Sequence, residues 1–128
     1  MDRKKLIKTL SFLTVTLFLV NSLANKFYWY SAIWYFDMIM HTLGGICLGL
    51  ASVYFFPPKD SSLKSLLKIL LFVFVVGVGW EVFEIIFYNI IAQTPFNALD
   101  TISDVFFDLA GGGLAVLYFL KNYISIEK

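Results

Sequence analysis

The chain has 128 residues, of which 59% are hydrophobic, 19% aromatic and only 15% charged, and its mean hydropathy is +0.79. A soluble domain is about half apolar and about a quarter charged, so this composition indicates an integral membrane protein organised as a single membrane domain, residues 1–128. The single cysteine excludes a disulfide framework and a cysteine-based zinc site. A net charge of +1, with no basic patch among aromatic residues, gives no support for nucleic-acid binding.

Four apolar stretches are long enough to cross a bilayer, which takes about 20 residues of helix. They are residues 6–24, 37–56, 66–92 and 100–120. We therefore predict an all-α fold, an integral membrane bundle of four transmembrane helices. The third stretch is longer than the hydrocarbon requires, so it should tilt or extend beyond it.

The three connections between these spans differ in composition. The first, KFYWYSAIWYF (26–36), is rich in the aromatic side chains that gather at membrane–water boundaries, so we expect it to lie in the interface. The second, FPPKDSS (56–62), contains consecutive prolines, which end a helix. The third, AQTPFNALD (92–100), has Pro95 as a helix breaker and Asp100 as a candidate N-cap of the last helix.

The basic residues lie almost entirely on one side of this arrangement. Nine of the ten precede the first span, surround the second connection or follow the last span, and only Lys26 lies on the other side. Because cytoplasmic loops carry an excess of Lys and Arg, we expect a multi-pass protein of the cell membrane with both termini in the cytoplasm. Alternatively, the first apolar run, with small residues before Asn25, is a cleaved signal peptide, which would leave three spans.

Six of the nine acidic residues and the only histidine lie in or at the edge of the last three spans. They are Asp37, His41, Glu81, Glu84, Asp100, Asp104 and Asp108. At a rise of ~1.5 Å per residue, all of them fall within roughly 16 Å of the outer helix ends, in the outer half of the bilayer. Spacings of three and four residues place those of each helix on one face. We expect the three faces to meet inside the bundle.

Glycines follow these polar residues on the deeper side. They are Gly44, Gly45, Gly49, Gly77, Gly79 and Gly111 to Gly113. Small residues allow membrane helices to approach closely, and ordinary helix packing is sufficient to explain them. We expect them to close the bundle beneath the polar layer.

A charged side chain at the centre of a membrane helix costs about 2.5–3.5 kcal/mol, so the acids require a shared proton, water or a bound cation. Mixed carboxylate and imidazole ligands suit zinc, manganese or iron. We therefore predict a divalent metal site in which Glu81 or Asp37 acts as general base. The predicted ligands are His41, Glu84, Asp104 and Asp108.

Some of these residues have a second interpretation. His41 could be the general base instead of a ligand, and a hydrogen-bonded interior histidine is the ordinary alternative. Asp37 and Asp100 lie where helices begin, so either could be an N-cap at the membrane surface.

Three stretches of the last three spans carry a resemblance to a known group of proteins. They are DMIMHTLGG (37–45), WEVFE (80–84) and DTISDVFFDLAGG (100–112). This order, an Asp-x-x-x-His opening, an acidic helix and an Asp-rich helix running into glycines, resembles the VanZ-like families, including the YjdF type. Met38 and Asp104 stand where those families typically have a basic residue and an amide. The resemblance implies a small polytopic protein of the cell envelope, linked in some relatives to glycopeptide-antibiotic resistance.

Three functions from different classes remain compatible with these patterns. The first is a metal-dependent membrane enzyme, a hydrolase or transferase acting on a lipid or lipid-linked substrate near the outer leaflet. The second is a proton- or cation-coupled carrier, which with four helices would require a homo-oligomer. The third is a non-catalytic scaffold or binding module whose polar cluster only fixes the geometry of the bundle.

Overall fold

The computed structural model describes residues 2–93 and 96–127, and their side chains except those of residues 92 and 124–127. The elements in chain order are α1 (Arg3–Lys26), α2 (Trp29–Ala32), α3 (Phe36–Phe55), α4 (Leu63–Phe87), the π-helical turn η1 (Tyr88–Ala92) and α5 (Ala98–Glu127). No strand occurs in these described ranges, which confirms the predicted all-α fold.

Four helices of the described chain are long and apolar enough to cross a membrane. They are Arg3–Lys26, Phe36–Phe55, Leu63–Ile91 and Ala98–Tyr123. Each of the four predicted stretches coincides with one of these helices, and the boundaries differ by up to three residues. Pro95, the expected breaker of the third connection, lies outside the described residues.

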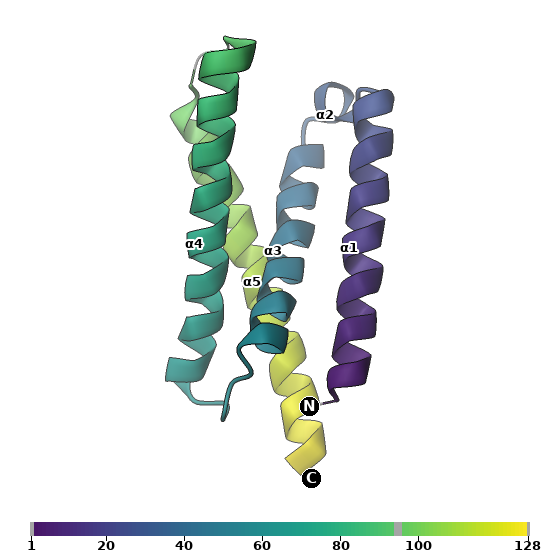
Figure 1. Cartoon of the computed structure of the whole chain (residues 1–128), viewed down its shortest axis with the longest axis vertical. Helices are drawn as coiled ribbons and strands as arrows, with labels where there is room; N and C mark the ends of the chain where they lie inside the picture. The colour runs from purple at the N-terminus through teal and green to yellow at the C-terminus, as the bar shows by residue number, and fades with distance from the viewer. Residues whose placement is uncertain (1, 94–95, 128) are drawn as a thin grey trace.

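Successive long helices run in opposite directions, so α3 and α5 run the same way, and these two cross at the centre of the bundle (Figure 1). α1 packs along α3 on one side and α4 packs against α3 and α5 on the other. The bundle therefore has two distinct ends: the terminal end, where both chain termini lie, and the α2 end, where the short helix α2 joins α1 to α3 (Figure 1).

The crossing of α3 and α5 depends on glycines. A Cβ atom on Gly45 would overlap the carbonyl oxygen of Asp108, and one on Gly111 would overlap the carbonyl oxygen of Thr42. Such backbone contact between helices is possible only without side chains, which is the packing expected of small residues in membrane helices. The predicted close approach of helices does not occur at every glycine. A Cβ on Gly113 would meet no described atom within 4 Å.

The apolar core lies toward the terminal end. Its buried members are Leu6, Leu50, Val53, Ile69, Ala115, Val116 and Phe119. They come from all four long helices, so this half is held by close packing. Among the buried residues that the structure describes, Ser52 is the only polar one in this half.

A second apolar cluster connects α1, α2 and α3 at the α2 end. Phe36 packs edge-on against Trp29 and Tyr30, with ring centroids 5.8 and 5.0 Å apart. The Tyr30 hydroxyl donates a hydrogen bond of 2.6 Å to Oδ1 of Asn21 on α1. Burial, followed by the nearby charge of Asp37, raises the pKa of Tyr30, so this hydroxyl remains protonated and fixes α2 to α1.

The helix starts differ from the predicted caps. The Asn97 side chain accepts a hydrogen bond of 3.3 Å from the backbone N–H of Asp100, so Asn97 caps α5 and Asp100 lies within the first turn. Asp37 likewise lies inside the first turn of α3, and its N-cap, Tyr35, makes no side-chain capping bond. The two capping predictions are therefore wrong by two and three residues, although an acid in a first turn still interacts favourably with the helix dipole.

Candidate functional site

Helices α3, α4 and α5 bring polar side chains together in the α2-end half of the bundle. The six residues of this polar cluster are Asp37, His41, Glu81, Glu84, Asp104 and Asp108. They form three groups in which one nitrogen or oxygen atom from each of three residues lies within 4.8 Å of the others. The convergence of the three polar faces, expected from the helical spacing, is thus observed.

His41 lies at the centre of the cluster and uses both ring nitrogens. Nδ1 is 2.9 Å from Oδ1 of Asp108, which is a hydrogen bond. Nε2 faces Oδ1 of Asp104 at 3.5 Å and Oδ1 of Asp37 at 3.6 Å. These last two separations are longer than ordinary hydrogen bonds, so Nε2 and the two carboxylates face one another without direct bonding.

Asp108, which belongs to α5, contacts the other two helices of the site. Its backbone carbonyl lies against Gly45 of α3, one helical turn beyond His41. Its carboxylate lies over Gly77 of α4, where a Cβ would come within 2.7 Å of Oδ2. The two glycines therefore leave room for Asp108, whose carboxylate is hydrogen-bonded to the His41 ring.

The two glutamates of α4 have different surroundings. Glu84 accepts a hydrogen bond of 2.9 Å from Nε1 of Trp80. Glu81 is only 3% exposed, and its Oε1 atom has no hydrogen-bond partner in the described part of the chain. A buried carboxylate oxygen without a partner is costly, because its lost hydration is not replaced.

Exposure decreases along the cluster. The side chain of Asp37 is 38% exposed, whereas that of His41 is 12% and those of Asp104 and Asp108 are 5% and 7%. The cluster is therefore open at Asp37 and closed at Asp108. Asp100 was expected on the same face of the last helix as Asp104 and Asp108. It is exposed and belongs to none of the three described groups.

The cluster contains much more negative than positive charge. Five of its six residues are carboxylic acids, and every ion pair found among the described residues involves His41. Even a protonated His41 would neutralise one acid only. The arrangement can therefore attract a cation, and its atoms are of the types that bind divalent metals.

Trp80 was not among the predicted site residues, yet its indole N–H donates a hydrogen bond to Glu84. Because Trp80 and Glu84 are four residues apart on one helix, the i, i+4 spacing was the available signal. Likewise, the sequence could not show that an oxygen of Glu81 would be buried without a partner in the described chain while Glu84 accepts a hydrogen bond, since this depends on how α4 is rotated toward α3 and α5.

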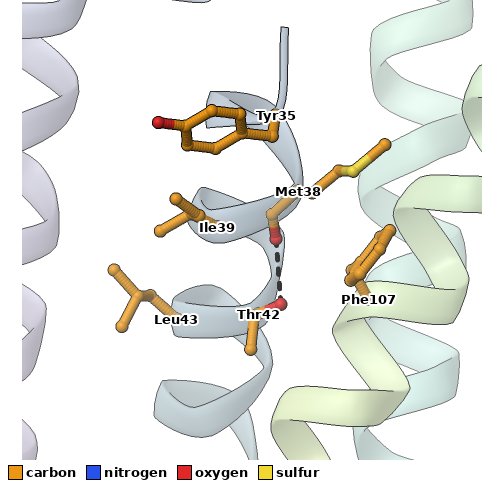
Figure 2. A pocket seen from close by; sticks show the side chains of 6 residues that line it. All are labelled: Tyr35, Met38, Ile39, Thr42, Leu43 and Phe107. Atoms are coloured by element: carbon orange, nitrogen blue, oxygen red, sulfur yellow. Dashed lines mark hydrogen bonds between the residues drawn. The ribbon is translucent and has the colours of Figure 1, made fainter. Parts of the chain in front are cut away.

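A pocket of about 230 Å³ lies elsewhere on α3 (Figure 2). Its walls are Tyr35, Met38, Ile39, Thr42, Leu43 and Phe107. The Thr42 hydroxyl donates to the carbonyl of Met38 at 2.9 Å, so it offers no free donor to a ligand (Figure 2). These apolar walls suit contact with a lipid chain and hold none of the cluster's acids, so the pocket is not the chemical site.

A comparison with protein families gave a match over residues 1–123, to the family described as "Predicted membrane protein (DUF2238)". The chain belongs to this family. Membership in DUF2238 confirms the expected small membrane protein and gives no specific support to the resemblance to VanZ-like families. Comparisons with curated proteins and with solved structures found no match.

Proposed function

We propose that this DUF2238 protein binds a divalent metal ion within the polar cluster. The observation that carries the proposal is Glu81 Oε1, a carboxylate oxygen that is buried without a partner in the described chain. A cation in contact with Glu81 would supply the missing partner and offset the repulsion among the surrounding acids.

A second position within the cluster, at His41 Nε2, also has the spacing of a metal site, in a group that does not include Glu81. Ligand atoms bound tetrahedrally to zinc at about 2.0–2.2 Å lie about 3.3–3.6 Å from one another. The Nε2 separations of 3.5 Å to Asp104 and 3.6 Å to Asp37 fit that spacing. Asp108, hydrogen-bonded to Nδ1, then has the role of the carboxylate that orients a metal-binding histidine. Zinc, manganese and iron are the metals that this mixed ligand set suits.

The chemistry that such an ion supplies is Lewis-acid activation, which suits hydrolysis or group transfer on a lipid or lipid-linked substrate. Glu81 and Asp37, the candidate general bases, are both members of the groups that would surround the ion, so either could accept a proton from a reacting water. The excess of basic residues on one side of the bundle supports termini in the cytoplasm, and together with the resemblance to VanZ-like families of the cell envelope it supports a reaction near the outer leaflet.

A carrier is less well supported by the same geometry. Transport requires polar groups that continue toward the opposite membrane surface. Beyond Asp108 the described core becomes apolar, with Leu50, Ile69 and Phe119 almost fully buried. A site that is open at one end and closed by packing at the other favours binding and chemistry at one surface.

Metal analysis of the detergent-purified protein tests the proposal. After incubation with Zn²⁺ or Mn²⁺ and removal of free ion, we expect stoichiometric retention by the wild type and by Asp100→Asn, the matched control outside the cluster. Asp104→Asn should lose the ion, because Asp104 belongs to two of the three groups. Absence of retained metal in the wild type, or full retention in Asp104→Asn, would contradict the proposal.

The enzymatic part requires a separate measurement. Fluorescent lipid phosphate esters and acyl esters in proteoliposomes should be hydrolysed by the metal-loaded protein, and a chelator should abolish the reaction. A metal-loaded protein that turns over neither class of lipid would retain the binding function and exclude this hydrolysis.

A further inference from the structure

The polar cluster contains more ligand groups than one metal ion can use. Two of the three groups share a single residue, Asp104, and otherwise have no member in common. One consists of Asp37, His41 and Asp104, and the other of Glu81, Glu84 and Asp104. We infer that the cluster holds two divalent cations, one in each group, with the Asp104 carboxylate shared between them. This inference rests on the proposed function.

Asp104 has the position that a shared ligand requires. It comes from α5, whereas the remaining ligands of the first group come from α3 and those of the second group from α4. Its side chain is 5% exposed, so its two oxygens face protein groups rather than solvent. A carboxylate can offer one oxygen to each of two ions, and such ions lie about 3.5–4 Å apart in two-metal sites.

Glu81 is the observation that requires an ion outside the group around His41 Nε2. The group around His41 Nε2 does not include Glu81, so an ion bound there alone would leave Oε1 of Glu81 without a partner in the described chain. An ion held by Glu81, Glu84 and Asp104 would give this oxygen a partner. The Trp80 N–H already orients Glu84 through one oxygen, as an outer hydrogen bond orients a metal-binding carboxylate.

The balance of charge also favours two ions over one. With all five carboxylates ionised and His41 neutral, one divalent cation would leave three excess negative charges in an environment of low dielectric constant. Two divalent cations would leave one. The two groups also differ in chemistry, since the first includes an imidazole and the second consists only of oxygen ligands, the type preferred by manganese and magnesium. Manganese suits both.

Manganese binding to the purified full chain tests this inference. The wild type should retain two Mn²⁺ per chain, and its electron paramagnetic resonance spectrum should show exchange coupling between neighbouring ions. Glu84→Gln should retain one ion and give the spectrum of isolated Mn²⁺, because Gln still accepts from Trp80 but loses the negative charge. Asp37→Asn should also retain one ion, now in the second group.

Asp100→Asn is the matched control, because Asp100 is an exposed acid on the same helix as Asp104; it should retain two coupled ions. Circular dichroism and size-exclusion elution equal to wild type establish that each variant is folded. One ion in the wild type would overturn the two-ion inference and leave the proposed function intact. No ion would overturn both, and two coupled ions in Glu84→Gln would overturn the assignment of the second group.

Discussion

The two halves of the α3–α4–α5 bundle are built from the same helices but are stabilised in opposite ways. Toward the terminal end, buried side chains such as Leu50 and Phe119 are apolar and closely packed. Toward the α2 end, the buried residues include Glu81, Asp104 and Asp108, among them an oxygen atom without a partner in the described chain. The packed half therefore stabilises the fold, whereas burying the acids in the other half lowers its stability.

This comparison predicts a large loss of stability when the packed half is disturbed. Phe119→Ala should lower the free energy of unfolding by roughly 3–5 kcal/mol, because the ring is 1% exposed and its removal leaves a cavity. Thermal unfolding in detergent measures the effect. Leu117→Ala is the matched control on the same helix, since Leu117 is 62% exposed and should change stability little. Equal losses for the two variants would show that this half is not held by packing.

A second prediction concerns the crossing that joins the two halves. Gly45→Ala should cost about 1–3 kcal/mol, because the new Cβ would overlap the Asp108 carbonyl and neither backbone can move freely. Gly113→Ala is the control, since its Cβ would meet no described atom within 4 Å. Melting temperatures of the two variants should therefore differ clearly. A Gly45→Ala protein as stable as Gly113→Ala would show that the helices can separate locally.

The third prediction has the opposite sign. Glu81→Met should raise the stability of the metal-free protein by about 1–3 kcal/mol, because it removes a buried oxygen that lacks a partner and keeps the side-chain volume. Glu84→Met should give no such gain, since Glu84 already accepts from Trp80. Unfolding in the presence of a chelator compares them. A destabilised Glu81→Met would mean that Glu81 is stabilising even without a metal.

The smallest predicted effect on stability concerns Asp60, which lies outside both halves, just before the start of α4. Asp60 accepts hydrogen bonds from Ser62 and Ser65, which lower its pKa from 3.8 to about 2. Because the folded-state pKa is depressed, its contribution to stability is present above about pH 4 and is lost as the pH falls through the folded-state value.

Wild type and Asp60→Asn can therefore be compared by thermal unfolding between about pH 5 and pH 2. The difference between their melting temperatures should be small and constant near pH 5 and should shrink toward zero at pH 2. A difference that is independent of pH would indicate that the Asp60 charge does not contribute.

Much of the fold could be predicted from the sequence because each part depends on local composition. Hydropathy located the four spans, and spacings of three and four residues predicted that the polar faces of α3, α4 and α5 would meet. Asn97 shows the limit at helix ends, since asparagine and aspartate are both good caps and the chosen one depends on where the chain turns.

The inner arrangement of the cluster could not be predicted for a similar reason. The rotation of each helix about its own axis decides which ring nitrogen of His41 bonds Asp108 and which glutamate of α4 is left without a partner in the described chain. Those rotations follow from the contact between Gly45 and the Asp108 backbone. A sequence pattern records which face a residue occupies, but not how closely two faces approach.

The position of Asp108 has a mechanical consequence. Its backbone touches α3 at Gly45, its carboxylate lies over Gly77 of α4, and the residue itself belongs to α5. Sliding α4 along the other two helices would therefore displace the same carboxylate that holds the His41 ring. A change in the register of the three helices would thus change the geometry of the polar cluster as well. Any influence that shifts α4 along the membrane normal, such as a change in bilayer thickness, would be transmitted directly to His41.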